Sequence, residues 1–248
     1  MRAIDLSSDL GEGAGTDEAI MPFITSANVA CGAHAGDEAT MRGTIELAVR
    51  HGVSVGAHPG YRDPAHFGRV PLELAPEALL ADLVSQLDAL RAIARAAGVR
   101  LAHVKAHGAL YNSGERDASV ASTIVEAVRR FDEDLVLFAP LGSAMERAAR
   151  DVGIRVAREG FADRAYDPDG TLRPRRLPGS VHTDPSVAAA QAVALARDGL
   201  VRASDGSDLA IEVDTICVHG DTPNAPAIAR AVRAALDAAG VAVRPFAT

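Results

Sequence analysis

Short apolar runs recur along the chain, and most of them end at glycine, proline or ionisable residues. Their length and their content of Val, Ile, Leu and Ala predict buried β-strands. We predict seven strands, at Ala3–Leu6, Ile24–Cys31, Val53–Ala57, Leu101–Lys105, Leu135–Ala139, Gly153–Arg158 and Ile211–Val218. Four of the eight histidines stand near the end of such a run, within two residues of glycine or proline. Packing alone does not explain this recurrence, so it indicates a shared site.

Stretches with helical periodicity separate these runs. The clearest helix begins at Pro76 and is closed by Gly98, because apolar residues recur there on one face. Further helices are predicted from Asp37 to Gly52 and from Asp117 through Val128. Another follows the strand Leu135–Ala139 and ends at Val152, and a separate helix begins at Pro185. The last helix begins with the pair Thr222 and Pro223 and ends at Gly240. We also predict a long polar loop at Ala165–Thr183 and a last short strand at Val241–Val243.

The alternation of strands and helices predicts an α/β fold with a parallel sheet. Residues 1–248 contain no linker or low-complexity break, so we predict a single β/α-barrel domain. The competing architecture is a doubly wound open sheet, but the chain has neither G-x-G-x-x-G nor the phosphate loop G-x-x-x-x-G-K-[ST]. In a barrel the loops that follow the strands carry the chemistry, so the polar clusters are expected to meet at one mouth.

The composition limits the classes of partner. Apolar residues make up 48% and charged residues 23% of the chain, which is typical of soluble globular proteins. The net charge of −8 argues against nucleic-acid binding. The chain contains no apolar stretch that approaches the ~18 residues of a membrane helix and no N-terminal hydrophobic signal region, so we predict a cytoplasmic protein without a membrane segment. Cys31 and Cys217 are expected to be reduced.

Lys105 and His107 form the most specific local signal. Their separation of two residues places both side chains on one face of a strand. A lysine that faces the interior is rarely buried without a partner, so we expect a carboxylate or an anionic substrate beside Lys105. The competing interpretation is a salt bridge without a catalytic role.

The first three strand ends add further candidates. Asp9 and Glu12 can perform acid–base chemistry or hold a cation, or they can form a solvated acidic loop. His34 and Asp37 are spaced for a hydrogen bond that would fix the histidine tautomer, although Asp37 can simply cap a helix. His58 gains weight because it joins this set.

The later strand ends carry Glu159, Asp163 and Arg164, followed by His219 and Asp221. An arginine can hold a substrate carboxylate through two parallel hydrogen bonds, or it can form an internal ion pair. The last two residues precede a helix N-terminus, where anions are favoured. A metal site is also possible, although no compact motif such as H-E-x-x-H supports it; its candidate ligands are His34, His58, His107, His219 and Asp9.

Taken together, these segments resemble the motifs of the LamB/YcsF family. The matching segments, in order, are DLSSDLGEG, SANVACGAHAGD, GAHPGYRD, VKAHGALYN, EGFADRAY and CVHGDTP, from about Asp5 to Pro223. The resemblance implies a distorted seven-stranded (β/α) barrel, similar to that of the glycoside hydrolase and deacetylase group. Ser7, Ala33 and Ala106 depart from the family's usual motifs, whereas the ionisable residues are retained.

The resemblance also implies a reaction, the cleavage of 5-oxo-L-proline to L-glutamate with hydrolysis of ATP as co-substrate. Proteins of this kind act with two partners, subunits B and C of a 5-oxoprolinase. Because the chain has no phosphate loop, we hypothesise that the partners supply part of the ATP site.

Roles follow from this reaction as hypotheses. Arg164 or Lys105 would hold the substrate carboxylate or a phosphorylated intermediate. Asp9 or Glu12 would activate water, and His107 or His58 would carry the proton to the ring nitrogen. The remaining candidates are assigned to substrate binding; they are His34, Asp37, Glu159, His219 and Asp221.

Two other functions fit the same barrel. One is a metal-dependent carbohydrate deacetylase, for which a divalent ion held by Asp9 and histidines would be expected. The other is a non-catalytic metabolite-binding or regulatory barrel, against which the retained ionisable residues argue. Metal content separates the deacetylase from the 5-oxoprolinase, because a stoichiometric divalent ion held by Asp9 and histidines would favour the deacetylase. The sequence leaves open whether a divalent metal binds and whether the chain forms a homo-oligomer.

Overall fold

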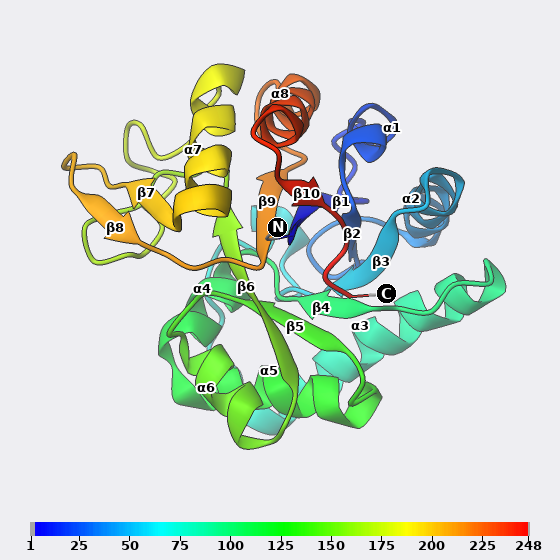
Figure 1. Cartoon of the computed structure of the whole chain (residues 1–248). Coiled ribbons are helices and arrows are strands. Elements are labelled where there is room, and N and C mark those ends of the chain that lie inside the picture. Colours follow the sequence, from blue (N-terminus) through cyan, green and yellow to red (C-terminus); the bar gives the residue numbers. More distant parts are fainter. Residues whose placement is uncertain (1–2, 248) are drawn as a thin grey trace.

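Seven parallel strands form a closed barrel in the computed structural model, which describes residues 3–247 (Figure 1). They are β1 (Ala3–Leu10), β2 (Ser26–Ala30), β3 (Ser54–His58), β4 (His103–Lys105), β5 (Val136–Ala139), β6 (Arg155–Phe161) and β9 (Thr215–His219). Strand β9 pairs in parallel with both β6 and β1, which closes the sheet. The predicted seven-stranded β/α barrel is therefore confirmed, and the open doubly wound sheet was the wrong alternative.

Helices surround the barrel and follow the strands in turn (Figure 1). They are α1 (Asp17–Ile20), α2 (Glu38–His51), α3 (Pro76–Ala96), α4 (Gly108–Arg116), α5 (Ala118–Phe131), α6 (Ala144–Asp151), α7 (Pro185–Asp198) and α8 (Ala225–Ala238), with short 3-10 turns at η1 (Met21–Phe23) and η2 (Pro64–His66). An antiparallel hairpin, β7 (Leu200–Arg202) with β8 (Asp208–Ala210), follows α7. Within residues 3–247, none of the helices combines the length and apolar character needed to cross a membrane.

The boundaries of the early strands differ from the prediction. Strand β1 continues to Leu10, so Asp9 lies within the strand rather than after it. The predicted strand stopped at Leu6, before the polar residues Ser7, Ser8 and Asp9, but the barrel interior accepts polar side chains that find hydrogen-bond partners. Strand β4 is shorter than predicted, and helix α4 begins directly after it at Gly108, a helix that was not predicted.

The last elements give one correction and one confirmation. Helix α8 begins at Ala225, preceded by Asn224 in the left-handed region (φ 66°), so Thr222 and Pro223 do not cap it as predicted. The Thr222 hydroxyl instead donates to Asp163 Oδ2 at 2.6 Å, which ties the loop back to the barrel. The predicted final strand is present as β10 (Ala242–Val243), paired with the start of β1.

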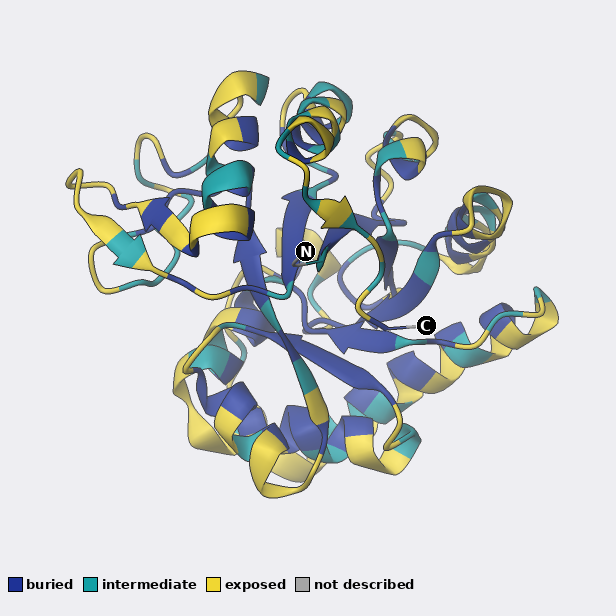
Figure 2. Cartoon of the chain, viewed as in Figure 1, coloured by how far each residue is buried: buried dark blue, intermediate teal, exposed yellow. Residues whose placement is uncertain are grey.

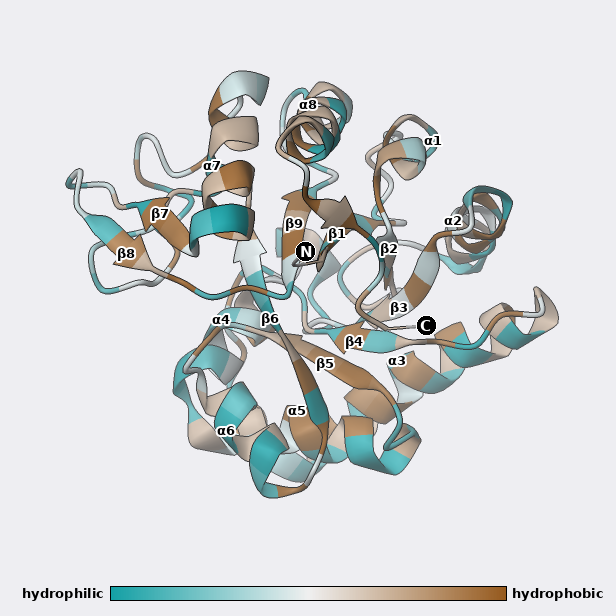
Figure 3. Ribbon diagram, in the orientation of Figure 1, coloured by the Kyte–Doolittle hydropathy of each residue, from teal (hydrophilic) through white to brown (hydrophobic). Residues whose placement is uncertain are grey.

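The layer between the strands and the helices is apolar. Helix α3 shows the principle, because its leucines at every third or fourth position form one buried face, at Leu79, Leu83, Leu87 and Leu90. Buried positions line the barrel side of the helices while exposed positions face outward (Figure 2), and the hydropathy follows the same division (Figure 3). Burial of a leucine contributes about 1.5–3 kcal/mol, so this layer stabilises the scaffold.

The inside of the barrel is polar by contrast. Asp5 accepts hydrogen bonds from the hydroxyls of Ser26 and Thr215, each at 2.7 Å. The ring of His103 occupies the space beside β3, where any side chain at Gly56 would collide with it. A small apolar cluster that includes Phe138 and Ala247 lies among these inward-facing strands. This polar column leads up to the carboxyl ends of the strands.

Candidate active site

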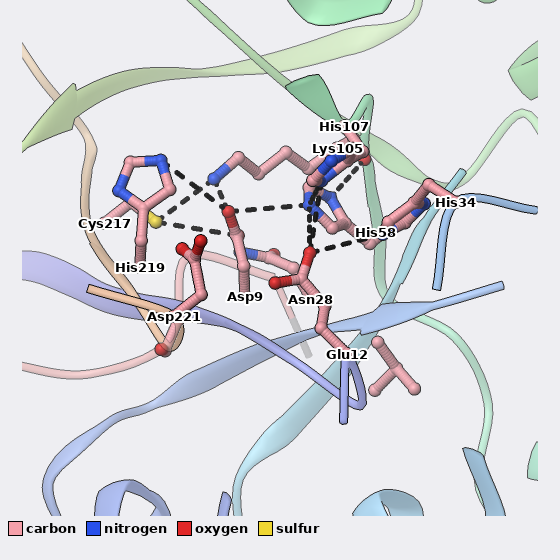
Figure 4. A network of polar contacts seen from close by, with 12 residues as sticks. Asp9, Glu12, Asn28, His34, His58, Lys105, His107, Cys217, His219 and Asp221 are labelled. Carbon is pink, nitrogen blue, oxygen red and sulfur yellow. Dashed lines mark hydrogen bonds and ion pairs between the residues drawn. The ribbon is translucent and has the colours of Figure 1, made fainter. Parts of the chain in front are cut away.

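Lys105 stands at the centre of the mouth between two carboxylates. Its Nζ lies 2.8 Å from Asp9 Oδ1, a contact drawn in Figure 4, and 3.0 Å from Glu159 Oε1. All three side chains are buried. The carboxylate expected beside this lysine is therefore present as Asp9 on β1, and β6 contributes a second carboxylate, Glu159. Lys105 is also the only lysine among the 25 basic residues, a signal that the sequence prediction did not use.

The Lys105–Asp9 pair is held in its charged form. Burial would lower the pKa of Lys105, but the carboxylates of Asp9 and Glu159 oppose it, Asp9 most strongly, and the pKa lies well above its ordinary value. Burial would raise the pKa of Asp9, but His58 and Lys105 together hold it well below the ordinary range. Asn28 adds a hydrogen bond to Asp9 Oδ1 at 2.9 Å.

Glu159 differs from Asp9 although it shares the same lysine. Burial is the largest influence on Glu159 and raises its pKa. Glu159 forms an ion pair with Lys105 at 3.0 Å, and the buried hydroxyl of Tyr111 lies close enough to interact with the carboxylate. Among the described residues, however, no hydrogen bond of good geometry satisfies either carboxylate oxygen or that hydroxyl. Buried polar groups with unused hydrogen-bonding capacity mark a place where a ligand can supply the missing hydrogen bonds.

His219 and Asp163 form a buried histidine–carboxylate pair on the opposite side of Asp9. His219 Nδ1 lies 2.9 Å from Asp163 Oδ1, and its Nε2 lies 3.9 Å from Asp9 Oδ2. Asp163 also accepts from the His219 backbone N–H and from Thr222, and His219 and these bonds outweigh burial to lower its pKa to about 2. Burial lowers the pKa of His219 despite its carboxylate partner, so a neutral ring is favoured.

A second group, which we call the histidine cluster, consists of Glu12, His34, His58 and His107. Glu12 Oε1 lies 3.1 Å from His107 Nδ1, 3.2 Å from His34 Nε2 and 3.7 Å from His58 Nε2. One ligand atom from each of the four residues lies within 4.8 Å of the others, so the group could hold a metal ion. Of the metal ligands considered from the sequence, three histidines belong to it, whereas Asp9 and His219 do not.

The charge state of this cluster is set by its burial and its neighbours. The histidines hold the pKa of Glu12 far below its ordinary range against the effect of burial. Burial lowers the pKa of His34 to about 4 and also lowers that of His107. His58 is the exception, because Asp9 outweighs the effect of burial and raises its pKa.

A cavity of about 320 Å³ opens over these groups and has the size of a site for a small molecule. Its lining includes Asp9, His58, Lys105, His107, Tyr111, Phe161, Arg164 and His219, with three further arginines, Arg69, Arg175 and Arg176. The sequence prediction missed those three arginines, which come from the loops after β3 and β6. Several cations at the opening favour an anionic ligand.

Arg164 and Asp221 lie on the cation-rich side. The guanidinium of Arg164 donates to the carbonyls of Arg173 and Ser180 at 2.7 and 3.2 Å, and within residues 3–247 it forms no ion pair. Burial lowers its pKa to about 10, which leaves it charged at neutral pH. Asp221 instead pairs with Arg69 at 2.5 Å, so it neutralises one of the cations and holds the loop.

Asp37 lies apart from the other candidates. It is exposed, and it caps α2 by accepting hydrogen bonds from the backbone N–H and the hydroxyl of Thr40, at 2.8 and 2.7 Å. It does not form the expected hydrogen bond with His34, whose partner is Glu12. The short distance in sequence between His34 and Asp37 was therefore misleading, because a carboxylate from another strand end fills that place.

The two cysteines are buried and free. Burial raises the pKa of Cys31 to about 12 and holds that of Cys217 well above its ordinary range. Both thiols therefore remain protonated, and neither forms a disulfide, as expected from the sequence. Cys217 still takes part in the site, because its Sγ lies 3.1 Å from Lys105 Nζ.

The fold and the site define a (β/α)-barrel protein with its polar groups gathered at the carboxyl ends of the strands, the position of active sites in such barrels. The chain belongs to the LamB/YcsF family, whose model matches residues 4–248. A relative from Symbiobacterium thermophilum, named as the A subunit of 5-oxoprolinase, is 51% identical over 98% of this chain and 95% of its own length.

Solved structures agree with this assignment. A lactam utilization protein from Thermus thermophilus superposes with a TM-score of 0.92 and 46% identity, over 98% of this chain and all of the other. A family 4 carbohydrate esterase from Streptomyces lividans superposes with a TM-score of 0.52 at 12% identity, over 98% of this chain and 91% of the other. The second likeness shows the fold alone, and it confirms the predicted similarity to the deacetylase barrels.

Proposed function

We propose that this protein is the A subunit of an ATP-dependent 5-oxoprolinase, which opens 5-oxo-L-proline to L-glutamate. The observation that carries the proposal is the near full-length relationship to proteins of that name, at 51% identity. The relationship favours this function over a carbohydrate deacetylase and over a regulatory barrel. A cytoplasmic location fits an enzyme that consumes ATP.

The cavity suits a small anionic lactam. 5-Oxoproline carries a carboxylate and a ring amide, and the opening presents cationic arginines to the first while buried polar groups lie below for the second. Arg164 is the best partner for the carboxylate, because it is charged and has no carboxylate partner among the described residues. Lys105 is less suited to that role, since two carboxylates already hold it.

Ring opening requires water to add to the lactam carbonyl carbon, the C–N bond to break and the ring nitrogen to gain a proton. Asp9 is the group proposed to activate water, because it is ionised, fixed by Lys105 and Asn28, and lines the cavity. His219 is the proposed proton carrier. Its Nδ1 is engaged by Asp163, which directs Nε2 toward Asp9 and the cavity.

This assignment changes the proton carrier expected from the sequence. His58 and His107 line the cavity, but their ring nitrogens are engaged by backbone carbonyls and by the histidine cluster. Glu159 and Tyr111 are proposed to receive the ring amide, because both are buried and neither is satisfied by a hydrogen bond of good geometry, although Glu159 is paired with Lys105. A lactam N–H can donate to the carboxylate and a lactam oxygen can accept from the hydroxyl.

A lactam is a stable amide, so its opening needs to be driven. Transfer of the terminal phosphoryl group of ATP to the amide oxygen, with ADP as the leaving group, would supply that drive. When water adds and the C–N bond breaks, the phosphoryl group would remain on the glutamate side chain as an acyl phosphate, whose hydrolysis by a second water releases phosphate. Since this chain has no phosphate-loop motif, we propose that subunits B and C bind ATP and complete the enzyme.

The test is glutamate release from 5-oxoproline and ATP by the purified protein, measured alone and with subunits B and C. We expect release only when all three are present, together with stoichiometric release of phosphate. Full activity of the protein alone would contradict the role of the partners. No release in the complete mixture, combined with release of acetate from N-acetylated sugars by this chain alone, would support the deacetylase instead.

A further inference from the structure

The histidine cluster brings ligand atoms from four successive strand ends to one point. Glu12 follows β1, His34 follows β2, His58 ends β3 and His107 follows β4. All four residues are buried, and Figure 4 shows them gathered on one side of Asp9. The reactive chemistry proposed above does not use this cluster, so its purpose needs a separate explanation.

Backbone carbonyls fix the tautomers of two of the rings. His58 Nδ1 lies 2.9 Å from the carbonyl oxygen of Lys105, and His107 Nε2 lies 2.8 Å from that of Phe67. A carbonyl can only accept, so these two nitrogens carry the protons. In the neutral rings the lone pairs therefore lie on His58 Nε2 and His107 Nδ1, which face each other at 3.0 Å.

Facing lone pairs repel unless a metal ion or a proton lies between them, and Glu12 adds a carboxylate to the same point. The backbone that orients His107 is itself held in an uncommon conformation, because Phe67 has a φ of +56°. Gly68 follows with a φ of +60°, and a side chain there would crowd His34 and His107. Metal-binding histidines commonly donate the N–H that faces away from the metal to a carbonyl or carboxylate, as His58 and His107 do to the carbonyls of Lys105 and Phe67.

The separations match a four-coordinate ion. Ligand atoms at the corners of a tetrahedron around Zn²⁺ lie about 3.3 Å apart, given metal–ligand distances near 2.0–2.1 Å. Four of the six pairs of ligand atoms in the cluster lie 3.0, 3.1, 3.2 and 3.7 Å apart. The rings of His34 and His107 stack in parallel with centroids 3.7 Å apart, so the ring of His34 has to turn for its nitrogen to point at the same ion. The unpartnered Nδ1 of His34 leaves the tautomer of that ring unconstrained, so its Nε2 can also serve as a ligand.

We propose that Glu12, His34, His58 and His107 bind one divalent transition-metal ion, with Zn²⁺ as the best fit for three imidazoles and one carboxylate. Four protein ligands leave no open position, so the ion is structural and joins four loops beside the cavity. Asp9 is a neighbour rather than a ligand, with its Oδ2 3.5 Å from His58 Nε2. This inference does not depend on the proposed function.

The first experiment measures metal binding by the full chain without using activity. The protein is stripped with a chelator and titrated with Zn²⁺ by calorimetry, and Co²⁺ is added separately as a spectroscopic probe. We expect one ion per chain, the intense visible absorption of four-coordinate Co²⁺, and a Tm that rises with Zn²⁺ concentration. Absence of stoichiometric binding at micromolar Zn²⁺ and Co²⁺, or the weak spectrum of six-coordinate Co²⁺, would overturn the proposal.

Variants locate the ion. Glu12→Gln and His107→Asn each remove one ligand and are expected to weaken Zn²⁺ binding by at least about 100-fold. His51→Gln is the matched control, because this exposed histidine at the end of α2 can bind metal only adventitiously. Unchanged affinity in both ligand variants would overturn the site. If the variants do not fold, the wild-type titration and the Co²⁺ spectrum still decide.

The outcomes are separable from those of the proposed function. Full glutamate release by a protein that binds no metal would reject the ion and leave the function intact. Stoichiometric metal binding without glutamate release in the complete mixture would support the ion and reject the proposed function.

Discussion

Two groups of buried ionisable residues meet at one mouth, and they are built on opposite principles. On the cavity side, charges of opposite sign alternate, as in the contacts of Lys105 with Asp9 and Glu159. In the histidine cluster, three ring nitrogens and a carboxylate oxygen converge instead. The first arrangement is balanced internally and open to a ligand, whereas the second is closed and calls for a cation.

The comparison shows that burial alone does not determine what a histidine can do, because the hydrogen-bond partner of the ring decides which nitrogen is available. His219 and His58 lie on either side of Asp9, 3.9 and 3.5 Å from its Oδ2 (Figure 4). Asp163 engages Nδ1 of His219, so that Nε2 faces Asp9 and the cavity. His58 has no such carboxylate behind it, since a backbone carbonyl occupies that position and its free nitrogen faces His107.

Replacement of Lys105 by Met should have the largest effect. It should disrupt the ion pairs with Asp9 and Glu159 and leave metal binding by the histidine cluster unchanged. The change leaves Asp9 and Glu159 as buried carboxylates without their cation, and breaking a buried pair typically costs about 3–5 kcal/mol of folding stability. We expect glutamate release with the partner subunits to fall by about 10³-fold. Unfolding by urea and Zn²⁺ titration should be measured alongside.

Lys105→Arg is the matched control, because it keeps the positive charge and should retain more activity than Lys105→Met. Zn²⁺ stoichiometry should remain unchanged in both variants, since Lys105 Nζ points toward Asp9 and Glu159. Equal turnover of wild type and Lys105→Met would remove this residue from the site. Loss of metal in the folded Lys105→Met variant would show that the two groups are not separate.

Asp163→Asn should reduce kcat by about 10²-fold, because the ring of His219 loses the carboxylate that orients it. The pH profile gives a second readout. Asp163 raises the pKa of His219 against the effect of burial, so its removal should lower that pKa further and keep the ring neutral to lower pH. The acid limb of the kcat profile should therefore move to lower pH.

Thr222→Val is the control for this change. It removes a hydrogen bond of 2.6 Å to Asp163 but leaves the carboxylate beside His219. We expect a smaller loss of kcat and little movement of the acid limb. An Asp163→Asn variant whose acid limb stays in place would show that His219 does not carry the proton.

Arg164→Met should act on substrate binding. Hydrogen bonds to a charged group contribute about 1.5–3 kcal/mol, so KM for 5-oxoproline should rise by about 10–100-fold while kcat changes less. Arg202→Met serves as a surface control, because that arginine is exposed on the β7–β8 hairpin. A fall in kcat with an unchanged KM would argue for a role in the reaction step instead.

The fold could be predicted from the sequence because the apolar layer has a regular pattern. The leucines of α3 recur at helical spacing, and the seven strands appear as apolar runs. The polar column was harder to predict. Asp9 and Glu159 interrupt the apolar pattern, so the prediction placed both after their strands, whereas the barrel buries them within β1 and β6.

The partners inside the site could not be predicted from spacing along the chain. Asp163 and His219 are 56 residues apart and meet only because β6 and β9 are neighbours in the closed sheet. Likewise, Glu12 reaches His107 across three strand ends. Strand ends therefore identify which residues share the mouth, whereas the order of strands around the barrel decides which of them pair.

Asp37→Ala should have the smallest effect, and it tests a residue that the sequence assigned to substrate binding. The structure places Asp37 at the exposed start of α2, where it caps the helix through Thr40. Loss of the cap should lower Tm by about 2–4 °C without changing KM, kcat or Zn²⁺ affinity. Asp37→Asn, which retains a capping oxygen, should recover most of the Tm. Both variants lose the charge of Asp37, but only Asp37→Ala loses the cap. A rise in KM that occurs in both variants would therefore show that the charge of Asp37 contributes to substrate binding.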